Sequence, residues 1–492
     1  MADTWPGFLL RSARITRSVY SGALGTRWAA AGCPGAHQRT GAAGAGGAGT
    51  RGRRAPGEAR IPGGRLASVT ASRVRALLVD TTPVDSIARL VPLLDARHPL
   101  LWLRHGSGMG GIGEAIRLEF RGPDRVRDAA AAWREVAAAA TVTDPLGIPG
   151  TGLIAFGAFA FADDSEAASV LVVPRLVVGR RDGVSWVTRI RLADQEDGDV
   201  ASPLDALAAG SIPVPERSGA EYRLHLRPGS MGPDDYETAV ARAVAAIAAG
   251  DVEKVVLARD LVGRLPLGGD LRLALSRFAL GYPDCWTYAV DGLIGASPET
   301  LVRVGGGTVG ARVLAGTVSR GTDARADAAA AAGLAASRKD NEEHAFARDS
   351  VLDALHPHSR DLSTTDAPFT LKLPNLWHLA SDVTGTLGDG SSSLDLVGAL
   401  HPTAAVAGHP TAAALSLIAE LEPADRGRYA GPVGWVAADG DGEWAIALRG
   451  AQVDPSGAIV AHAGAGIVAG SDPERERAET AMKFRPVVEA LG

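Results

Sequence analysis

The stretch GAGIVAGSDPERERAETAMK, residues 464–483, decides how the end of this chain folds and how the rest is interpreted. A mostly apolar, strand-like run at 458–463 precedes it, and the Gly-Ala-Gly sequence at its start predicts a tight turn. Ser471 or Asp472 can cap a helix there, and Pro473 suits the first helical position. The stretch therefore predicts a strand, a glycine-rich turn and a C-terminal helix.

The predicted C-terminal helix carries Glu476, Glu479 and Lys483, spaced three and then four residues apart. This spacing places all three side chains on one face of the helix. Two carboxylates and an ammonium group beside a glycine-lined backbone could hold a divalent cation and an anionic ligand. The alternative is a solvated face with i,i+4 ion pairing, and the helix considered alone favours that alternative.

The length and composition of the chain limit its class. Its 492 residues are enough for two or three ordinary domains, or for one large α/β unit with extra segments. The chain is 46% hydrophobic and 22% charged, as globular proteins are, and its net charge of −6 gives no reason to expect a nucleic-acid partner. The chain has no run of 18 apolar residues, so no membrane span is predicted. Only two cysteines, Cys33 and Cys285, are present, so a reduced, cytoplasmic protein is expected.

Lysine is rare in this chain. Of the 50 basic residues, four are lysine and 46 are arginine. A lysine in so arginine-rich a sequence is expected where a compact amine that can lose its proton is needed. Chance retention on the surface is the alternative explanation. It suits Lys372 better than the other three lysines, which lie in dense polar motifs: Lys254, Lys339 and Lys483.

We expect three regions along the chain. Residues 1–73 are rich in arginine, glycine and alanine and have no apolar periodicity, which predicts a disordered tail. A transit peptide is one interpretation of this tail, but a dispensable tail or a start codon placed too far upstream is preferred. Residues 74–230 are expected to form a β-rich half, and residues 231–492 the catalytic region.

Apolar runs separated by turn residues predict the strands. Residues 169–190 are expected to form two strands, and residues 286–304 two more around a turn at Asp291. Residues 443–453 are expected to form one strand that projects Arg449. Helices are predicted at 123–140, 233–250, 269–280 and 337–355.

The strand EKVVLARDLV, residues 253–262, places Lys254 on the same face as Val256, Ala258 and Asp260. A lysine among apolar neighbours can extend to water or pair with Asp260. Alternatively it is buried, and burial favours the neutral amine, which can act as a general base.

Further polar positions lie in separate segments of the second half. Glu299 follows a Ser-Pro turn, and Thr317 lies where a strand enters a glycine turn whose N–H groups can meet an anion. Asp340 and Glu343 form a second acidic helical face. The side chains best suited to binding an anion are Tyr429, Arg449 and Lys483.

These residues alone indicate a magnesium-dependent enzyme that acts on a small polycarboxylate, with Lys254 and Glu299 as the acid–base pair. No nucleophile motif, phosphate loop or dinucleotide fingerprint competes with this interpretation. A non-catalytic protein that binds the same ligand is a rival from another class. The complete acid–base pair argues against that rival, because a binding protein needs neither group.

Residues 233–491 resemble the chorismate-utilising enzymes, and among them the isochorismate synthases. The matching segments are, in order, EKVVLARD, GASPETLV, LAGTVSRG, SRKDNEEH, LWHLASDVTGTL, HPTAAVAGHP, RGRYAGPVGW, AIALRGAQV, and AGAGIV followed by ERERAETAMK. The set of segments is specific although no single one is. The resemblance implies an α/β (α+β) fold, a large layered β-sandwich flanked by helices with the active site between two sheets.

The resemblance implies a role for each matching residue. Lys254 would be the base that activates a water to attack C2 of chorismate, and Glu299 the acid that protonates the departing C4 hydroxyl. Carboxylates that would hold Mg²⁺ are Glu343 and Glu479, with Asp340 and Glu476 as supporting acids. The residues expected to line the substrate site are Thr317, His378, Ala405, Tyr429, Arg449, Gly464 and Lys483.

Few residues separate the subfamilies. Aminating anthranilate and aminodeoxychorismate synthases typically lack the water-activating lysine, so Lys254 argues against them. Salicylate synthases usually carry threonine where Ala405 stands, which disfavours the loss of pyruvate. Isochorismate synthases often have proline at the position of Ala404, and this departure touches no catalytic group.

The resemblance therefore implies an isomerase with chorismate as its substrate and Mg²⁺ as its cofactor, in menaquinone or siderophore biosynthesis. A cytoplasmic monomer is expected, without nucleic acid, membrane or an obligatory protein partner. Two alternatives within the class remain open. One is a salicylate synthase, and the other is an aminating synthase that needs a glutamine amidotransferase subunit.

Overall fold

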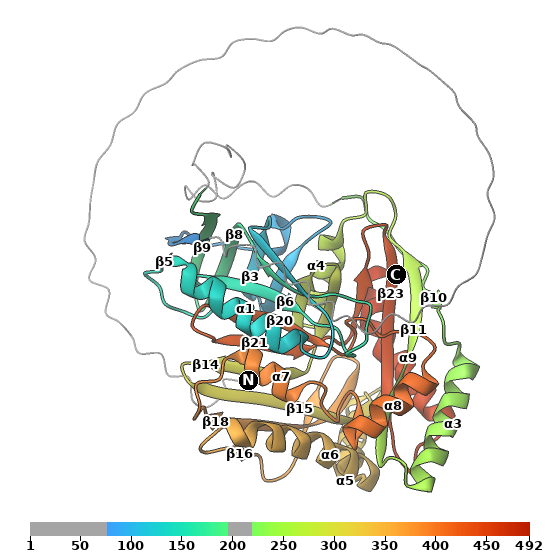
Figure 1. The fold of residues 1–492 in the computed structure, drawn as a ribbon. Coiled ribbons are helices and arrows are strands. Elements are labelled where there is room, and N and C mark those ends of the chain that lie inside the picture. The colour runs from blue at the N-terminus through green and yellow to red at the C-terminus, as the bar shows by residue number, and fades with distance from the viewer. Residues whose placement is uncertain (1–75, 195–218) are drawn as a thin grey trace, which may run out of the picture. The chain divides into compact units, whose positions relative to one another are not determined.

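The computed structural model describes residues 76–194 and 219–492 (Figure 1). The disordered tail expected at 1–73 lies outside the described residues. Within the described part are eight α-helices and two short 3₁₀ helices. They are α1 (Arg125–Ala139), α3 (Pro233–Ala249), α4 (Leu271–Gly281), α5 (Ala324–Ala336), α6 (Arg338–Leu355), α7 (Ser393–Leu400), α8 (Thr411–Leu421), α9 (Pro473–Leu491), η1 (Val91–Leu93) and η2 (His356–His358).

The larger of two sheets has 13 strands. All of its pairs are antiparallel except the parallel pair of β1 and β5. In spatial order its strands are β10 (Arg227–Pro228), β11 (Lys254–Arg264), β23 (Ala458–Ile467), β22 (Gly450–Val453), β13 (Leu293–Ser297), β12 (Trp286–Val290), β2 (Leu100–Arg104), β3 (Ser107–Ile112), β8 (Leu176–Arg181), β9 (Val184–Leu192), β1 (Leu77–Val84) and β5 (Thr141–Thr143), with β19 (Gly408–His409) beside β11.

The smaller sheet has 10 strands, all antiparallel. In spatial order they are β16 (Ser363–Thr364), β18 (Leu376–Thr386), β15 (Thr308–Ser319), β14 (Thr300–Gly305), β21 (Gly442–Ile446), β20 (Pro432–Ala437), β6 (Ile154–Ala158), β7 (Ser169–Val173) and β4 (Ile116–Phe120), with β17 (Phe369–Lys372) beside β18.

Strands from both halves of the chain share each sheet. In the 13-stranded sheet β2 pairs with β12, so that Trp102 lies opposite Tyr288. In the 10-stranded sheet β6 pairs with β20, so that Phe156 lies opposite Trp435. All four aromatic side chains are buried. The two halves therefore build one core, because aromatic residues from each half are buried in the same sheets.

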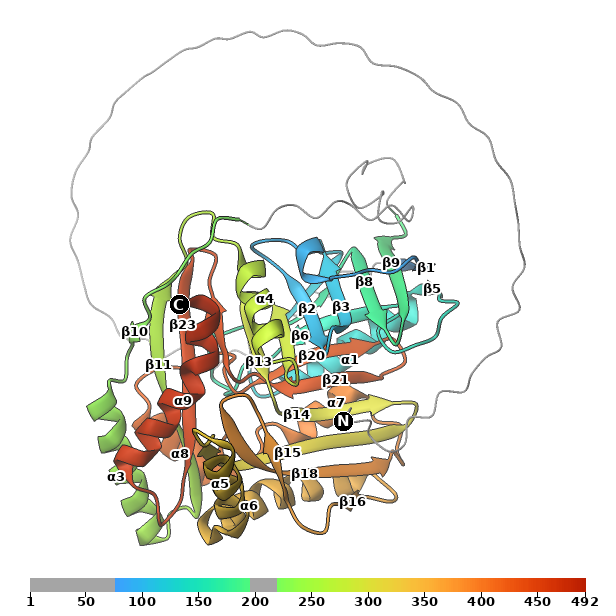
Figure 2. The ribbon, with the colours of Figure 1, turned by 180° about the vertical axis from the view of Figure 1, so that it is seen from behind.

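Helices cover the sheets (Figures 1 and 2). On the 13-stranded sheet α4 contacts β12 and β13, and α9 contacts β22 and β23. Phe278 of α4 and Phe484 of α9 belong to the buried cluster on that face. On the 10-stranded sheet α5 and α6 contact β15 and β18. Layered sheets flanked by helices agree with the fold predicted from the sequence.

Three segments contain more strands than the sequence predicted. Residues 169–190 contain β7, β8 and the start of β9, residues 286–304 contain β12, β13 and β14, and residues 443–453 contain β21 and β22. In each segment the chain leaves one sheet and enters the other. Strands on both sides of these passages are buried, so the apolar pattern does not reveal the change of sheet.

The Gly-Ala-Gly sequence predicted as a turn is instead the last part of β23, where Gly466 pairs with Val256 of β11. A Cβ on Gly464 would lie 2.7 Å from the Leu257 carbonyl oxygen, and a Cβ on Gly466 would lie 2.2 Å from Glu343 Oε1. A side chain is therefore excluded at Gly464 by the neighbouring backbone, whereas one at Gly466 would displace the Glu343 carboxylate.

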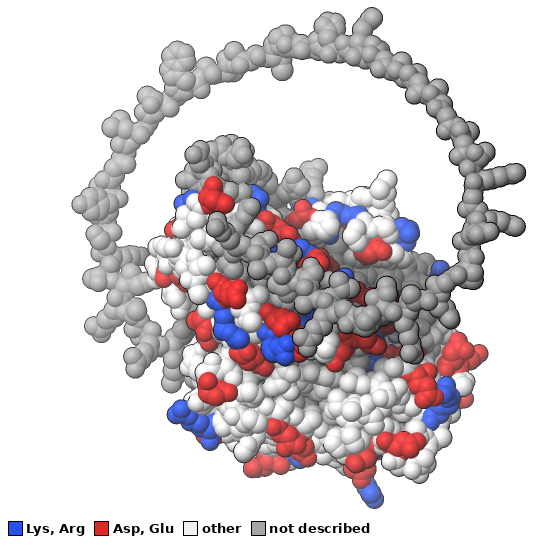
Figure 3. Space-filling model, viewed as in Figure 1, with Lys and Arg blue, Asp and Glu red and all other residues white. Residues whose placement is uncertain are grey.

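Acidic and basic side chains are interspersed on the face shown in Figure 3. Exposed pairs such as Arg338–Glu342, with 2.7 Å between Nε and Oε1, contribute little to stability in water. Among the described helices, none has both the length and the apolar character of a membrane span. The interactions that matter for stability are therefore the buried ones.

A buried carboxylate links the two sheets. Glu443 on β21 accepts a hydrogen bond of 2.9 Å from the indole N–H of Trp102 on β2. Its oxygens also lie 3.1 Å from Arg303 Nε and 3.7 Å from an Arg181 terminal nitrogen. Burial alone would raise the pKa of this carboxyl, but the two arginines and the indole donors hold the pKa below its usual range. Glu443 is therefore charged at neutral pH.

We predict that Glu443→Gln lowers the free energy of unfolding by about 2–4 kcal/mol, because it removes the charge that two partly buried arginines face. Urea denaturation at neutral pH measures this loss. The stabilisation by the carboxylate is present above its unfolded-state pKa and is lost as the pH falls through the lower folded-state pKa. The matched control is Glu489→Gln at a half-exposed pair on α9, which should cost less than about 1 kcal/mol. Equal losses in both variants would contradict the prediction.

Candidate active site

Two of the segments in which the chain passes from one sheet to the other lie side by side. These segments are called passages below. β13 and β22 are neighbours in the 13-stranded sheet, as are β14 and β21 in the 10-stranded sheet. Glu299 lies in the passage from β13 to β14, and Arg449 in the passage from β21 back to β22. The Ile446 N–H donates to the Glu299 carbonyl oxygen (3.1 Å), and the Ala296 N–H donates to the Arg449 carbonyl oxygen (3.3 Å). Each passage therefore holds the other in place.

Glu299 is buried, with 6% of its surface exposed. Burial raises the pKa of its carboxyl to about 7, although Arg449 and Lys254 act in the opposite direction. A carboxyl with this pKa is partly protonated near neutral pH, whereas an exposed glutamate with a pKa of about 4.3 is not. Glu299 can therefore donate a proton to a bound ligand.

Lys254 is the first residue of β11 and is fully buried. It does not extend to water, and it does not pair with Asp260, which accepts hydrogen bonds from Ser230 and from the Met231 N–H instead. The Lys254 Nζ lies 3.3 Å from Glu343 Oε1 and makes no hydrogen bond with any of the described residues. Its hydrogen-bonding capacity is thus available to a ligand or a water.

A cavity of about 50 Å³ lies between the sheets beside these groups. Its lining combines segments that are far apart in the sequence. The predicted residues that line it are Glu299, Thr317, Glu343, His378, Ala405, Tyr429, Arg449, Gly464 and Lys483. Four predicted residues lie outside the lining: Lys254, Asp340, Glu476 and Glu479. Lys254 and Glu479 each contact a lining residue through an ion pair.

His378 is held in one tautomer. Its Nε2 lies 3.3 Å from a terminal nitrogen of Arg449, and because arginine only donates, Nε2 is the acceptor. Its Nδ1 therefore carries the proton and lies 3.0 Å from Thr317 Oγ1 and 3.3 Å from the Gly316 carbonyl oxygen. Burial, and next the charges of Arg449 and Lys483, lower the pKa of His378 well below its usual value. The neutral ring orients the Arg449 guanidinium.

Arg449, Tyr429 and Lys483 bring donors for an anion to the cavity. Arg449 has a φ of 53°, a conformation that residues other than glycine rarely adopt, and it is buried. Burial raises the pKa of Tyr429 to about 12, so its hydroxyl keeps its proton. The Lys483 Nζ lies 2.9 Å from the Gly464 carbonyl oxygen and 2.5 Å from Glu479 Oε1. The arrangement can bind a carboxylate.

The predicted metal ligands come from two helices, Asp340 and Glu343 from α6, and Glu476 and Glu479 from α9. Burial, and next the charge of Glu479, raise the pKa of Glu476. Burial lowers the pKa of Lys339, but the charges of Glu476, Glu343 and Glu479 raise it above its usual value. Glu476 and Glu479 therefore repel each other, and a cation relieves that repulsion.

The carboxylates fit a hard divalent cation by their chemistry, because Mg²⁺ prefers carboxylate oxygens. They are not arranged as a finished metal site. Within residues 76–194 and 219–492, no three Asp, Glu, His or Cys side chains come together in a metal-binding group. Lysine ammonium groups lie against them instead, in the pairs Lys254–Glu343 (3.3 Å), Lys339–Glu476 (2.7 Å) and Lys483–Glu479 (2.5 Å). Cation binding there requires these pairs to rearrange.

The sequence did not single out the buried pair Glu422–Arg426, which anchors the strand of the buried lysine. Arg426 donates to the carbonyl oxygens of Val256 (2.7 Å) and Val406 (2.9 Å), and Glu422 Oε1 accepts from a backbone N–H of β11 (2.8 Å). The pair thus ties β11 to the loop that carries Ala405. The sequence signal that could have revealed this pair is its i,i+4 spacing, with Glu422 four residues before Arg426, the first residue of RGRYAGPVGW.

His344 was not predicted to have a role, although it lies next to Glu343. Its Nε2 is 2.8 Å from Ser381 Oγ and its Nδ1 is 3.3 Å from the Ala315 carbonyl oxygen. Burial lowers the pKa of His344 to about 4, so the ring is neutral. These contacts join α6 to β15 and β18 and so position Glu343. The partners lie far along the chain, where no local pattern connects them.

Comparisons with known proteins identify the family of this chain. A Mycobacterium tuberculosis protein, named provisionally as isochorismate synthase MenF, is 43% identical to this chain over 277 residues, which are 53% of this chain and 74% of the relative. Isochorismate synthase DhbC of Bacillus subtilis is 38% identical over 319 residues, which are 59% of this chain and 80% of the relative.

A solved structure shares the fold. It is MenF, the menaquinone-specific isochorismate synthase from Escherichia coli, which superposes with a TM-score of 0.67 at 24% identity, over 85% of this chain and 95% of that one. At this identity the likeness establishes the fold alone. A family model described as chorismate binding enzyme matches residues 77–492. This match covers both sheets and every residue of the cavity, and the chain therefore belongs to the family of chorismate binding enzymes.

Proposed function

We propose that this protein is an isochorismate synthase, an isomerase that converts chorismate into isochorismate. One observation carries the proposal. A carboxyl whose pKa burial raises to about 7, that of Glu299, lies within electrostatic reach of the fully buried amine of Lys254. An acid and a base that are both shielded from water suit the exchange of a hydroxyl group between two ring carbons. The relatives that are named isochorismate synthases support the same assignment.

In the proposed reaction the amine of Lys254 acts as the base that removes a proton from a water, whose oxygen forms a bond to C2 of chorismate. Both ring double bonds shift by one position, from C1=C2 to C1=C6 and from C5=C6 to C4=C5, and the C4–O bond breaks. Glu299 gives its proton to the departing C4 hydroxyl, which leaves as water. One water enters and one leaves, so the product is an isomer of the substrate. The raised pKa of Glu299 keeps the needed proton available near neutral pH.

The substrate carboxylates are proposed to bind Arg449, Tyr429 and Lys483, with backbone groups near Gly464 and Thr317. Arginine can hold a carboxylate with two parallel hydrogen bonds. His378 would lie near the ring, and Ala405 would leave room beside it. The cavity of about 50 Å³ is smaller than a usual ligand pocket of about 300–1,000 Å³, so side chains must move when the substrate enters.

Mg²⁺ is the proposed cofactor. The residues that would hold it are Glu343 and Glu479, with Asp340 and Glu476 beside them. When bound, the ion would offset the repulsion between these carboxylates and a carboxylate of the substrate. Lys483 and Lys254, which face two of these glutamates, would then be released toward the substrate. Isochorismate made here is proposed to enter menaquinone or siderophore biosynthesis.

The function is tested by product analysis. Incubation with chorismate and Mg²⁺, with and without ammonium, followed by liquid chromatography, should give isochorismate alone. The product should disappear when the metal is chelated. Salicylate with pyruvate, or an aminated product, would place the protein in another subfamily. No product under any of these conditions would contradict an enzymatic function.

We predict that Lys254→Ala lowers kcat by at least about 100-fold, because no other buried amine can activate the water. The dissociation constant for chorismate, measured by equilibrium binding, should change by less than about tenfold. The matched control is Lys372→Ala, which removes an exposed lysine paired with Asp327. This control should keep wild-type activity. Full activity of Lys254→Ala would remove Lys254 from the mechanism.

The pH dependence should follow Glu299. Its carboxyl is protonated below its pKa of about 7, so kcat/KM should fall as the pH rises above about 7. Initial rates between about pH 6 and about pH 9 measure this decline. Glu299→Gln, which cannot donate the proton, should reduce kcat/KM by about 100-fold or more and abolish the decline. A variant that keeps the decline would show that another group causes it.

A further inference from the structure

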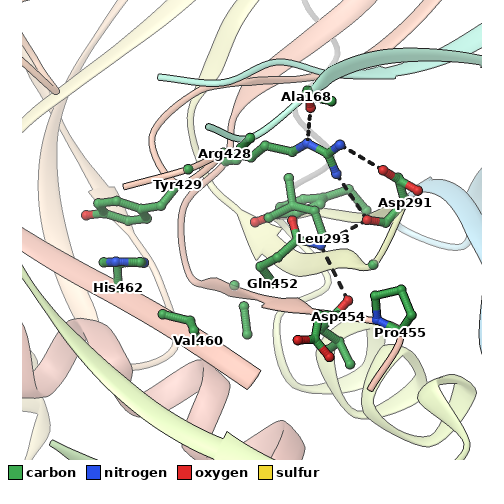
Figure 4. A pocket seen from close by; sticks show the side chains of 18 of the residues that line it. Ala168, Asp291, Leu293, Arg428, Tyr429, Gln452, Asp454, Pro455, Val460 and His462 are labelled. Atoms are coloured by element: carbon green, nitrogen blue, oxygen red, sulfur yellow. Dashed lines mark hydrogen bonds and ion pairs between the residues drawn. The ribbon is translucent and has the colours of Figure 1, made fainter. Parts of the chain in front are cut away.

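A second, larger cavity adjoins the site already described. Its volume is about 470 Å³, within the range of about 300–1,000 Å³ that small-molecule sites occupy. Tyr429 lines both cavities, and Arg426–Arg428, which precede it in the chain, and Gly450–Val453 contribute to the larger one. Figure 4 shows its interior, with Tyr429 beside His462 and the polar group of Arg428 and Asp291 on another wall.

Part of the lining of the larger cavity consists of apolar and aromatic side chains. Leu293 and Val460 project into the cavity, and Leu265 and Leu271 belong to its lining. The ring of His462 stacks on Tyr429, with 5.1 Å between the ring centroids and 22° between the planes. Burial lowers the pKa of His462 to about 4, so this surface is neutral. A flat apolar ring can pack against it.

The polar wall contains more arginine donors than its own carboxylate uses. Asp291 accepts hydrogen bonds from two guanidinium groups, both terminal nitrogens of Arg117 (2.9 Å each) and one of Arg428 (2.7 Å). Arg428 also donates to the carbonyl oxygens of Ala168 and Asp291. A guanidinium has five N–H groups, so Arg428 has two more to offer.

The other carboxylates of the lining are already engaged. Asp425 accepts hydrogen bonds from the Ser165 hydroxyl and from the N–H groups of Glu166 and Gly427. Asp454 accepts one from the Ala458 N–H. Because these oxygens are used locally, they compete little for the arginines of the cavity.

Arg97 supplies a cation that has no partner among the described residues. It is half-buried at the cavity, and its guanidinium makes no hydrogen bond or ion pair with the residues that the structure describes. The backbone N–H of this residue donates a hydrogen bond to Asp95 Oδ1 (2.7 Å). A partly desolvated guanidinium is stabilised by an anion, above all by a carboxylate that accepts two hydrogen bonds.

We propose that this cavity is a second binding site, for a small carboxylate with an apolar ring, whose carboxylate lies at Arg97 and Arg428 and whose ring lies against Leu293, Val460 and the Tyr429–His462 stack. Two sources could supply this chemistry. One is the cyclic acid that the enzyme converts or releases, held next to the catalytic cavity. The other is a separate aromatic acid. The first source rests on the proposed function, whereas the site itself does not.

The site is tested with 4-fluorobenzoate on the full-length chain, by fluorine NMR line broadening. Saturable binding is expected. Arg97→Ala should weaken it about tenfold by removing a charge-assisted pair, and Val460→Trp should abolish it by filling the cavity. The matched control Arg325→Ala, an exposed arginine on α5, should bind as the wild type does. Lys483→Ala, at the catalytic cavity, should also leave binding unchanged.

Absence of saturable binding would overturn the proposal. So would binding that is lost in Lys483→Ala but kept in Val460→Trp, since the probe would then occupy the catalytic cavity.

A second experiment identifies which of the two acids is the ligand. Chorismate is titrated into Lys254→Ala, which should not turn it over. If Lys254→Ala binds two equivalents of chorismate and the double variant with Val460→Trp binds one, the ligand of the large cavity is the enzyme's own cyclic acid. One equivalent, with 4-fluorobenzoate still bound by the wild type, would support a separate aromatic acid. If product analysis finds no turnover, the 4-fluorobenzoate results still decide whether the site exists.

Discussion

The active-site region depends on hydrogen bonds between two neighbouring passages of the chain from one sheet to the other. A strand that leaves its sheet inside a packed core must find new partners for its N–H and C=O groups. Here the passages supply them to each other, because the Ser297 hydroxyl donates to the Ile446 carbonyl oxygen (2.6 Å) and the Ile446 N–H to the Glu299 carbonyl oxygen. Glu299 and Arg449 can therefore be buried between the sheets on backbone whose carbonyl oxygens are hydrogen-bonded.

Burial between the two sheets also determines the protonation of Glu299. Removing a carboxyl from water favours its protonated form, which is why the pKa of Glu299 rises despite the cations near it. The lysines of the cavity region are each offset by a carboxylate, as Lys254 is by Glu343 at 3.3 Å. A buried ion pair of this kind contributes little net stability. We propose that it holds a compact amine at a defined position, which would account for a lysine in a chain that otherwise uses arginine.

Tyr429 connects the two cavities. It lines the small cavity together with Gly464, and its ring stacks on His462 on the side of the large one. The Glu422–Arg426 pair lies just before it in the chain and fixes the same segment to β11. A ligand in the large cavity would therefore touch a segment that also bounds the catalytic cavity.

The sequence by itself determined five of the eight described helices, many of the strands and the identities of the polar residues, because apolar periodicity, capping residues and motif spacing are local properties. It did not predict α5, α7 or α8. It predicted the C-terminal helix from its Asp472 cap and Pro473, and the structure has that helix. Only the tertiary structure decided where the chain changes sheets, that the Gly464–Gly466 segment continues a strand, and that Lys254 faces Glu343 and not Asp260. These features depend on contacts between segments far apart in the chain, and no local pattern encodes them.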